Sequence, residues 1–465
     1  MNYFSLIVFL FRLHRISTTA RSRAVHRVAE TPITLYPKVW VDKLGQEHSN
    51  PVLEDSNIKV ISWNILGPYH AETAKHNYAE TKVVLWNKRR EKILSEIRGM
   101  NADIICLQEV SSKSLKETFI PGLRHLGLEC CGYAPMQITG RGRGKYAHKG
   151  LGCAVFARSS KVTVLTSKKV YLRDFFPHDT CRSHSFLSDL EKRWNSMVMM
   201  LVRIDSTNQT LLVGNTHLYW NPSRADIKTA QGLSVVNALS KFTDALKANK
   251  TICELCNLFR DDIEINSDDK GNFRMKADDN FVQIETWSPT SESLLSVPPQ
   301  SLALTNTKGA TLPLILCGDF NTMPEYSRDG LNCIPSGLFH LLTRGELPSD
   351  HPEHPDSWHT SMTFKDANPR IGRMSSRWRL RNAYVEPKFE NRRPLFTTKT
   401  DDFQGWIDHV FVNEKVDVEM VWSPPIYAGD LEANTKARSF GPIPDSQFPS
   451  DHLPIGIVAR ISSIS

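Results

Sequence analysis

Residues 312–321, Leu-Pro-Leu-Ile-Leu-Cys-Gly-Asp-Phe-Asn, restrict the possible folds more than any other stretch of the chain. Their first half is a continuous apolar run, which is typical of a strand buried on both faces of a sheet. The run stops at Gly318, and a carboxylate and an amide follow at Asp319 and Asn321. Because these side chains are two residues apart, an extended backbone directs both to one side. An isolated Asp-Phe-Asn would more often be an Asx turn that closes a strand.

Further apolar runs carry polar side chains at one end, so the turn interpretation does not suffice. Residues 151–158 and 196–204 are predicted strands without such ends. The runs with polar ends are 58–66 with Asn64, 103–110 with Glu109, 210–218 with Asn215 and His217, 404–412 with Asp408, and 453–461, which follows Asp451 and His452.

Helical patterns separate these runs. Ile93 and Ile97 mark one apolar face of a helix predicted over 85–98, and Val235, Leu239 and Phe242 mark another helix after Pro222. Strands that alternate with helices or turns predict an α/β fold of packed layers. We therefore expect the polar strand ends to meet at one rim of the fold.

The chemistry of these side chains indicates a metal-dependent site. Carboxylate and amide oxygens without cysteine are the ligands of hard cations such as Mg²⁺. Repulsion among Glu109, Asp319 and Asp408 would be costly without a bound cation. His217 and His452 offer protonatable nitrogens to a phosphate. A single buried Glu or His would more often be a hydrogen-bonded core residue, so the prediction of phosphodiester cleavage depends on the whole set.

Composition and charge narrow the class of protein only slightly. Apolar residues make up 40% and charged residues 23% of the 465 residues, as in an ordinary soluble globular protein. The net charge of +7 favours an anionic partner only weakly. The nine irregularly spaced cysteines favour a reducing compartment, and Cys253 and Cys256 have no second pair to complete a zinc site. No apolar stretch approaches the length of a membrane span, so we expect no membrane association.

Residues 1–55 are predicted to be a leader and linker. Their Arg-rich, acid-poor beginning fits mitochondrial import better than secretion, and an extension without a targeting role is the alternative. The expected location is intracellular, either mitochondrial or cytoplasmic. Residues 56–465 are predicted to form one catalytic domain. Residues 250–308 are polar and lack periodicity, so we interpret them as an inserted, partly disordered surface segment.

The ordered motifs resemble the endonuclease/exonuclease/phosphatase superfamily over about residues 56–465, apart from the insertion. The segments from Asn215 to Pro222 and from Phe403 to Asp408 are similar to the carbon-catabolite-repressor-type deadenylases and to their nocturnin, Angel and 2′-phosphodiesterase relatives. The resemblance implies a four-layer α/β sandwich of the deoxyribonuclease-I type, in which two mixed sheets lie face to face with helices outside. The motifs are Ser-Trp-Asn64, Leu-Gln-Glu109, Gly-Asn-Thr-His217, Gly-Asp319-Phe-Asn321, Ile-Asp408-His and Ser-Asp451-His452.

The resemblance also implies a metal site. Glu109 would be the principal Mg²⁺ ligand together with Asn64, and Asp319 and Asn321 would help to hold a second ion. Mn²⁺ can substitute in such sites. Two cations lower the pKa of the attacking water and neutralise the developing charge. Asp319 would orient or deprotonate that water, and Asn321 would fix the geometry.

The remaining implied roles concern the substrate. His452, held by Asp451, would stabilise charge in the transition state, while His217 would contact the scissile phosphate and Asp408 would lie beside His217 or the nucleophile. The expected substrate-binding residues are Asn215, Pro222 and Phe403. Pro222 and Phe403 fall where the deadenylases sandwich a base, and a core aromatic is the alternative for Phe403.

The chain departs from the family pattern at several positions. His409 stands where a tyrosine is more common, and Leu151 stands where many relatives have an acidic residue. Nothing upstream of Ile58 resembles the leucine-rich repeats that dock deadenylases into their large complex. That difference predicts a free-standing enzyme, and the sequence leaves the oligomeric state open.

The resemblance predicts a Mg²⁺-dependent 3′→5′ exoribonuclease that acts on the poly(A) 3′ ends of RNA and releases 5′-AMP. A 2′-phosphodiesterase or NADP(H) 2′-phosphatase of the same superfamily is one alternative. A non-catalytic RNA-binding module is the other, although the intact set of mutually repelling carboxylates counts against it.

Overall fold

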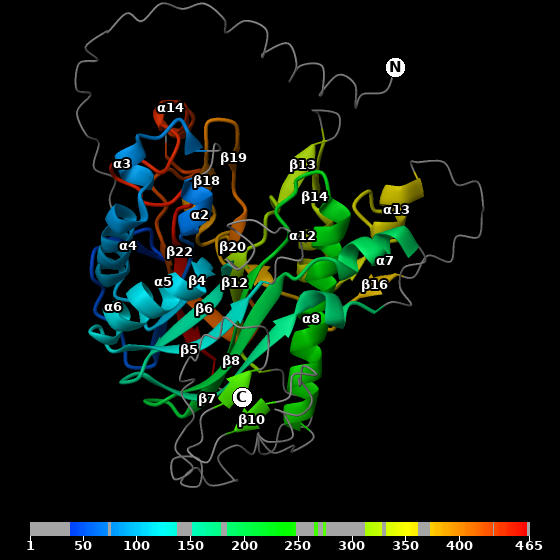
Figure 1. The fold of residues 1–465 in the computed structure, drawn as a ribbon, viewed down its shortest axis with the longest axis horizontal. Helices are drawn as coiled ribbons and strands as arrows, with labels where there is room; N and C mark the ends of the chain where they lie inside the picture. Colours follow the sequence, from blue (N-terminus) through cyan, green and yellow to red (C-terminus); the bar gives the residue numbers. More distant parts are fainter. Residues whose placement is uncertain are drawn as a thin grey trace, which may run out of the picture. The chain divides into compact units, whose positions relative to one another are not determined.

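Two mixed β-sheets pack face to face, with helices on their outer faces (Figure 1), in the computed structural model. This is the four-layer α/β sandwich that the family resemblance implies. The structure describes residues 38–72, 76–136, 151–177, 184–247, 265–267, 273–275, 312–327, 332–360, 373–430 and 432–462. All of them belong to the compact unit Lys38–Ser465.

The larger sheet has eight strands in the order β2-β1-β21-β22-β3-β4-β6-β5. Strands β3 and β4 are parallel to each other, and β22 runs antiparallel on the other side of β3. The strands are β1 (Trp40–Asp42), β2 (Glu47–His48), β3 (Asn57–Asn64), β4 (Ile104–Ser111), β5 (Leu128–Pro135), β6 (Leu151–Arg158), β21 (Val416–Trp422) and β22 (Ile455–Ile461).

The smaller sheet has six strands in the order β17-β20-β12-β9-β8-β7. At its centre, β12 is parallel to β9 and antiparallel to β20. The strands are β7 (Val162–Tyr171), β8 (Ser196–Ile204), β9 (Gln209–His217), β12 (Leu314–Asp319), β17 (Arg381–Asn382) and β20 (Asp408–Val412).

Each outer face of the sandwich is covered by helices that bury an apolar face. Ile93 and Ile97 of α4 (Trp86–Met100) pack on the eight-stranded sheet together with η2 (Leu115–Phe119) and α6 (Ile120–Arg124). The six-stranded sheet is covered by α8 (Ala225–Lys247), α12 (Gly337–Arg344), η3 (Leu172–Phe175) and α7 (His184–Glu191). A third apolar layer fills the space between the sheets.

The remaining elements are short. They are α2 (Pro68–Ala71), α3 (Thr81–Val84), α5 (Ser112–Ser114), α13 (Pro355–Thr360), η5 (Glu390–Arg392), α14 (Ala433–Ser439) and the paired strands β10 (Ile265–Ser267) with β11 (Phe273–Met275), β13 (Glu325–Ser327) with β14 (Cys333–Pro335), β15 (Glu346–Leu347) with β16 (Met374–Ser375), and β18 (Thr398–Lys399) with β19 (Gln404–Gly405).

Strand alternation determines which polar ends meet. On β3, Ile58 and Val60 face the layer between the sheets, so Asn64 continues that face at the end of the strand. On β12, Ile315 and Cys317 face the same layer, and Asp319 continues it. The same parity applies to His217 on β9 and to Asp408 on β20, because Leu211 and Val213, and Val410 and Val412, lie between the sheets.

A glycine is required where β12 approaches β9. Gly318 has φ +150°, and a Cβ at this position would lie 1.9 Å from the Thr216 carbonyl oxygen. A side chain here would therefore push β12 away from β9, the strand that carries His217.

The boundary predicted at residue 56 is wrong, because residues 38–55 belong to the sandwich. Strand β1 pairs with β21, and Trp40 lies opposite Trp422. Three residues are too short for a strand signal, so this segment reads as linker in the sequence. Residues 1–37 and most of the predicted insertion 250–308 lie outside the described residues; within 250–308, β10 and β11 form a short antiparallel pair.

Strands β5, β7 and β21 are absent from the sequence prediction. Strands β5 and β7 lie at sheet edges, and in all three strands partly exposed residues interrupt the apolar pattern. The strand predicted over 404–412 is divided into β19 and β20, which belong to different sheets. No helix among the described residues is long and apolar enough to span a bilayer.

His409 lies in the apolar layer beneath α12 and not in the site. Its ring contacts the rings of Phe339 and Phe411. Nε2 donates to the Thr322 carbonyl at 2.8 Å, and Nδ1 accepts from Asn382 Nδ2 at 3.2 Å. This arrangement satisfies a neutral imidazole, and burial lowers the pKa of His409 to about 4.

The low pKa of His409 predicts a loss of stability in acid. The unfolded chain binds a proton at this ring below about pH 6.5, but the folded chain does so only below about pH 4. Each unit of difference is worth roughly 1.4 kcal/mol, so the free energy of unfolding should fall by about 3 kcal/mol across this range. Urea unfolding should show a smaller fall for His409→Gln. The exposed His125→Gln is the matched control, and an equal fall in all three proteins would contradict the assignment.

Candidate active site

Asn64 connects the two sheets at the edge where the polar strand ends meet. Its Nδ2 donates to Asp319 Oδ2 at 3.0 Å and lies 3.3 Å from Glu109 Oε1. Its Oδ1 accepts from the Leu66 main-chain nitrogen, which holds the side chain in an Asx turn. Asn64 and Asp319 are each 1% exposed. Residues from β3, β4 and β12 are therefore held together as one buried polar group.

A β-bulge determines the direction of Glu109. The register between β4 and β6 shifts after Leu107, and Glu109 has φ +59°. Its Oε2 accepts from the Gly67 main-chain nitrogen at 2.7 Å and from His70 Nδ1 at 2.9 Å. Although burial opposes ionisation, these neighbours keep the pKa of Glu109 well below its usual range. Glu109 is thus an ionised carboxylate at the edge of the sheet, re-aimed by the bulge.

Asp319 lies between two other site residues on adjacent strands. In the ladder it is paired with His217 of β9 and with Asp408 of β20. His217 Nε2 lies 3.4 Å from Asp319 Oδ2. Burial and the opposing Asp408 carboxylate raise the pKa of Asp319, against the attraction of His217 and His452. Asp319 therefore binds a proton more readily than an ordinary aspartate.

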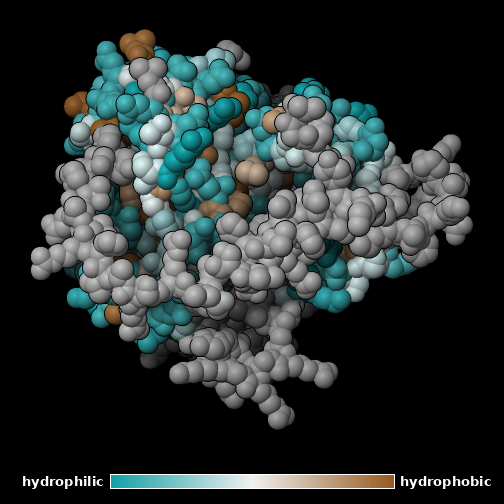
Figure 2. All heavy atoms as spheres, turned by 90° about the horizontal axis from the view of Figure 1, so that it is seen from above, coloured by the Kyte–Doolittle hydropathy of each residue, from teal (hydrophilic) through white to brown (hydrophobic). Residues whose placement is uncertain are grey.

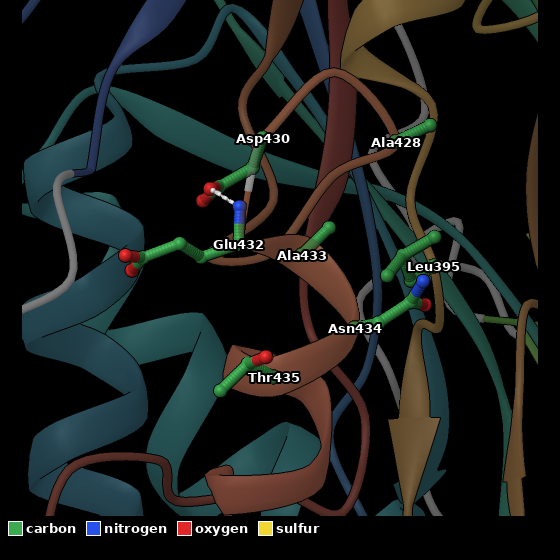
Figure 3. A pocket seen from close by; sticks show the side chains of 7 residues that line it. All are labelled: Leu395, Ala428, Asp430, Glu432, Ala433, Asn434 and Thr435. Atoms are coloured by element: carbon green, nitrogen blue, oxygen red, sulfur yellow. Dashed lines mark hydrogen bonds between the residues drawn. The ribbon is translucent and has the colours of Figure 1, made fainter.

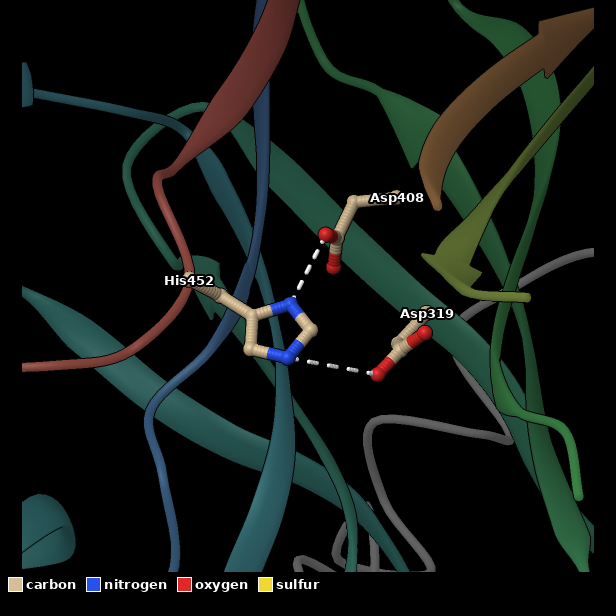
Figure 4. Close-up of side chains that lie close together, drawn as sticks. All are labelled: Asp319, Asp408 and His452. Carbon is tan, nitrogen blue, oxygen red and sulfur yellow. Dashed lines mark hydrogen bonds and ion pairs between the residues drawn. The ribbon is translucent and has the colours of Figure 1, made fainter. Parts of the chain in front are cut away.

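The ring of His452 lies between two carboxylates (Figure 4). Nδ1 is 2.8 Å from Asp408 Oδ2, and Nε2 is 3.8 Å from Asp319 Oδ2. Burial disfavours a charge on the ring, but the attraction of Asp408 and Asp319 outweighs it and holds the pKa of His452 well above its usual range. His452 is therefore an imidazolium that offsets the repulsion between the carboxylates.

The prediction that Asp451 holds His452 is wrong. The Asp451 carboxylate lies 3.1 Å from Nε2 of His76, and Asp408 takes the expected place beside His452. Successive side chains of an extended segment point in opposite directions, so two adjacent residues rarely face each other. Asp451 still borders the site, because the preceding residue, Ser450, donates its Oγ hydrogen to the Asn64 carbonyl.

Asn321 and Asn215 differ in position. The main-chain nitrogen of Asn321 donates to Asp319 Oδ1 at 2.9 Å, so Asn321 belongs to the site. Asn215 is fully buried between the sheets, where its Nδ2 donates to the carbonyls of Leu107 and Ala154. A side chain so enclosed cannot touch a substrate, and we assign Asn215 a structural role in place of the predicted binding role.

Pro222 and Phe403 are exposed, as substrate contacts require. Phe403 is 42% exposed at the end of the β18–β19 hairpin, so the core alternative is wrong. Thr398 of this hairpin forms a bridge with His452. The hairpin is therefore tied to the site.

Three residues contribute to the site but are absent from the sequence prediction: His70, His76 and Arg89. The two histidines follow β3 without periodicity, so no pattern singles them out. Arg89 is 1% exposed and donates to the carbonyls of Ile65 and Pro449, one from each site loop. Arg89 is four residues before Ile93 on α4 and shares its buried face, a signal that was available in the sequence.

Two groups of side chains could hold a cation. Asp319, Asp408 and His452 bring their ligand atoms within 4.8 Å of one another. In that group the charged His452 already supplies a positive charge. The ionised Glu109 offers carboxylate oxygens, which suit a hard divalent ion better. Asn64 directs its Nδ2 at the carboxylates, and its Oδ1 accepts from the Leu66 nitrogen.

The surface of the molecule carries a cavity whose lining residues are not those at the strand ends. Seen from above, the described surface is mostly hydrophilic, with separate apolar patches (Figure 2). A cavity of about 220 Å³ lies beside α14, where Asp430 accepts from the Glu432 main-chain nitrogen (Figure 3). Its lining residues are Leu395, Ala428, Asp430, Glu432, Ala433, Asn434 and Thr435.

Because Asp408, and not Asp451, is the carboxylate beside His452, the two residues should affect its pKa differently. Asp408→Asn removes the charge that attracts the ring and leaves only a weaker amide acceptor for Nδ1, so it should lower the pKa of His452 strongly. The matched Asp451→Asn should lower it much less, because Asp451 pairs with His76. NMR titration of the imidazole nitrogens measures both shifts. A larger effect of Asp451→Asn would contradict the observed pairing.

The chain is similar to several known proteins over most of its length. The chain is 26% identical over 410 residues to the CCR4-Not complex 3'-5'-exoribonuclease subunit Ccr4 of Phaeosphaeria nodorum, covering 88% of the chain and 60% of that protein. It is 23% identical over 454 residues to the Ccr4 subunit of Mycosarcoma maydis, covering 95% and 57%. The chain thus spans about three-fifths of the length of these relatives.

A solved structure shares the fold. ANGEL2, described as a 2',3'-cyclic phosphatase in complex with adenosine-2',3'-vanadate, superposes with a TM-score of 0.54 at 21% identity, covering 88% of this chain and 96% of that one. The Endonuclease/Exonuclease/phosphatase family model matches residues 61–241 and 278–452, a span that includes Asn64, Glu109, His217, Asp319 and His452. The chain therefore belongs to the endonuclease/exonuclease/phosphatase family.

Proposed function

We propose that this protein is a Mg²⁺-dependent 3′→5′ exoribonuclease that removes adenosine residues from the poly(A) 3′ ends of RNA and releases 5′-AMP. The observation that carries the proposal is the convergence of Asn64, Glu109, Asp319, Asp408 and His452 at one edge of the sandwich. The similarity to proteins named 3'-5'-exoribonucleases supports the choice of reaction.

Glu109 and Asn64 would hold the metal ion, and Asp319 and Asn321 would help to hold a second one. The ionised carboxylate of Glu109 fits such an ion, and Asn64 would turn its Oδ1 from the Leu66 nitrogen to the ion. Bound Mg²⁺ lowers the pKa of water and neutralises charge on the phosphate oxygens.

The protein side chains carry the remaining steps. Asp319, whose pKa is raised by burial and by Asp408, takes the proton of the attacking water. Burial disfavours a charge on His452, but the attraction of Asp408 and Asp319 keeps the ring protonated. The charged ring stabilises negative charge on the reacting phosphate. His217, 3.4 Å from Asp319, contacts the scissile phosphate.

Phe403 would stack on the base that precedes or follows the reacting phosphate, with Pro222 on the other side of that base. Its ring lies over Gly405, where a Cβ would meet the ring at 2.6 Å, so the glycine keeps the ring in its exposed position. Stacking on an aromatic side chain contributes roughly 1–3 kcal/mol per base.

Loss of the Glu109 charge should abolish turnover. Glu109→Gln keeps the shape but removes the main ligand charge, so hydrolysis of 3′-adenylated RNA should fall at least ~100-fold. Release of 5′-AMP with and without chelator is the measurement. Glu117→Gln, at an exposed residue of η2, is the matched control.

The choice of substrates separates the alternatives. Turnover of 2′–5′ oligoadenylate, NADPH or RNA with a 2′,3′-cyclic phosphate, without shortening of poly(A), would replace the proposal by a phosphodiesterase or phosphatase reaction. RNA binding that survives chelation, without turnover of any of these substrates, would indicate a non-catalytic module.

Phe403 should affect binding more than chemistry. Phe403→Ala should raise KM for adenylated RNA by about 5- to 100-fold, the equivalent of one lost stack, with kcat changed much less. Phe403→Trp should restore KM. Val385→Ala, at an exposed apolar residue elsewhere, is the matched control. Equal kinetics for Phe403→Ala and the wild type would refute the stacking role.

A further inference from the structure

Lys228 lies beneath the candidate active site and has no role in the reaction proposed above. It belongs to the first turn of α8 and is 5% exposed. Its Nζ donates to the main-chain carbonyl of Asn321 at 2.8 Å. The lysine thus connects the helix that covers the six-stranded sheet to the turn that follows β12.

A lysine is costly at this position for two reasons. Burial lowers its pKa to about 8, and the attraction of Glu353, Asp319 and Asp226 does not offset this effect. A positive charge in the first turn of a helix also faces the positive end of the helix dipole. An apolar side chain of similar volume would avoid both costs. The contact made by the ammonium group therefore has to explain why a lysine is present.

The nearby carboxylates have other donors. Asp226 is paired with Arg224 at 2.9 Å, and Glu353 accepts from the Gly337 main-chain nitrogen at 2.7 Å. The bond to the Asn321 carbonyl is accordingly the contact that an apolar replacement of Lys228 would remove.

That bond acts on an unusual backbone conformation. Asn321 has φ +51°, in the left-handed region that few residues other than glycine adopt. Its main-chain nitrogen donates to Asp319 Oδ1 at 2.9 Å, and its Nδ2 donates to the Leu218 carbonyl at 3.1 Å. Lys228 fixes the third polar group of the residue, its carbonyl oxygen. Such conformations persist where the surroundings hold them from several sides.

We propose that Lys228 is a positioning residue: its ammonium group fixes the Asn321 carbonyl and thereby the left-handed turn that aims Asn321 and Asp319 at the phosphate. The expected effect on kcat rests on the proposed function, whereas the expected effect on the Asn321 conformation does not. A misplacement of about 1 Å in a reacting group can cost ~100-fold in rate, so a bond outside the reacting groups is enough to matter.

Lys228→Met tests the proposal, because methionine fills the space without a donor. We expect kcat for adenylated RNA to fall ~10- to 100-fold, while KM stays within about twofold. The melting temperature should fall by only a few degrees, because removal of a buried charge partly offsets the loss of one hydrogen bond to the Asn321 carbonyl. A crystal structure of the variant should show Asn321 outside the left-handed region and its bond to Leu218 broken. Lys241→Met, at an exposed residue of the same helix, is the matched control and should match the wild type.

Each outcome decides the proposal. Unchanged kcat, or an Asn321 turn that persists in Lys228→Met, would overturn it. A fall of kcat that merely matches the loss of folded protein would also overturn it, because it would indicate a role in folding alone. If the wild type hydrolyses no RNA, the proposed function fails, and the conformation of Asn321 in the variant alone then supports or refutes the positioning role.

Discussion

Asp319 and Asp408 face each other on adjacent strands, and the repulsion between these two buried carboxylates is the constraint on which the site depends. Like charges directly opposite in a sheet are destabilising. The surrounding groups offset that cost: His452 lies between the carboxylates as an imidazolium, His217 lies 3.4 Å from Asp319, and Asn64 donates to it from the other sheet. The arrangement leaves an excess of negative charge that a cation or a proton can use.

The sandwich brings these groups together because its strands end at one edge. Strand β22 is antiparallel to β3, so the segment that precedes it, with His452, returns to the end of β3, where Asn64 lies. Strands β12 and β9 run parallel and end together. The buried Arg89 then joins the loops that follow β3 and precede β22, and Lys228 supports the turn after β12. Buried cations thus surround a site made mainly of anions.

Local sequence was sufficient wherever a residue's role depends on the parity of its strand. Asn64, His217, Asp319 and Asp408 each continue an apolar face, so their convergence follows from alternation once two packed sheets are assumed. The same rule placed Asn215 on the inner face but could not reveal that it lies too deep for a substrate, since depth depends on how far the opposing sheet extends. Strands β1, β5, β7 and β21 were not predicted, because their apolar patterns are short or interrupted by partly exposed residues.

The sequence by itself determined the layered α/β fold and the side chains that gather at its rim, because period-two alternation and apolar runs are local properties. Only the tertiary structure decided which partners those side chains take. Three features join residues far apart in the chain. They are the bulge between β4 and β6 that turns Glu109, the contact of Asp408 with His452, and the bond from Lys228 to Asn321. Their distances are set by sheet register and helix packing, which no local pattern encodes.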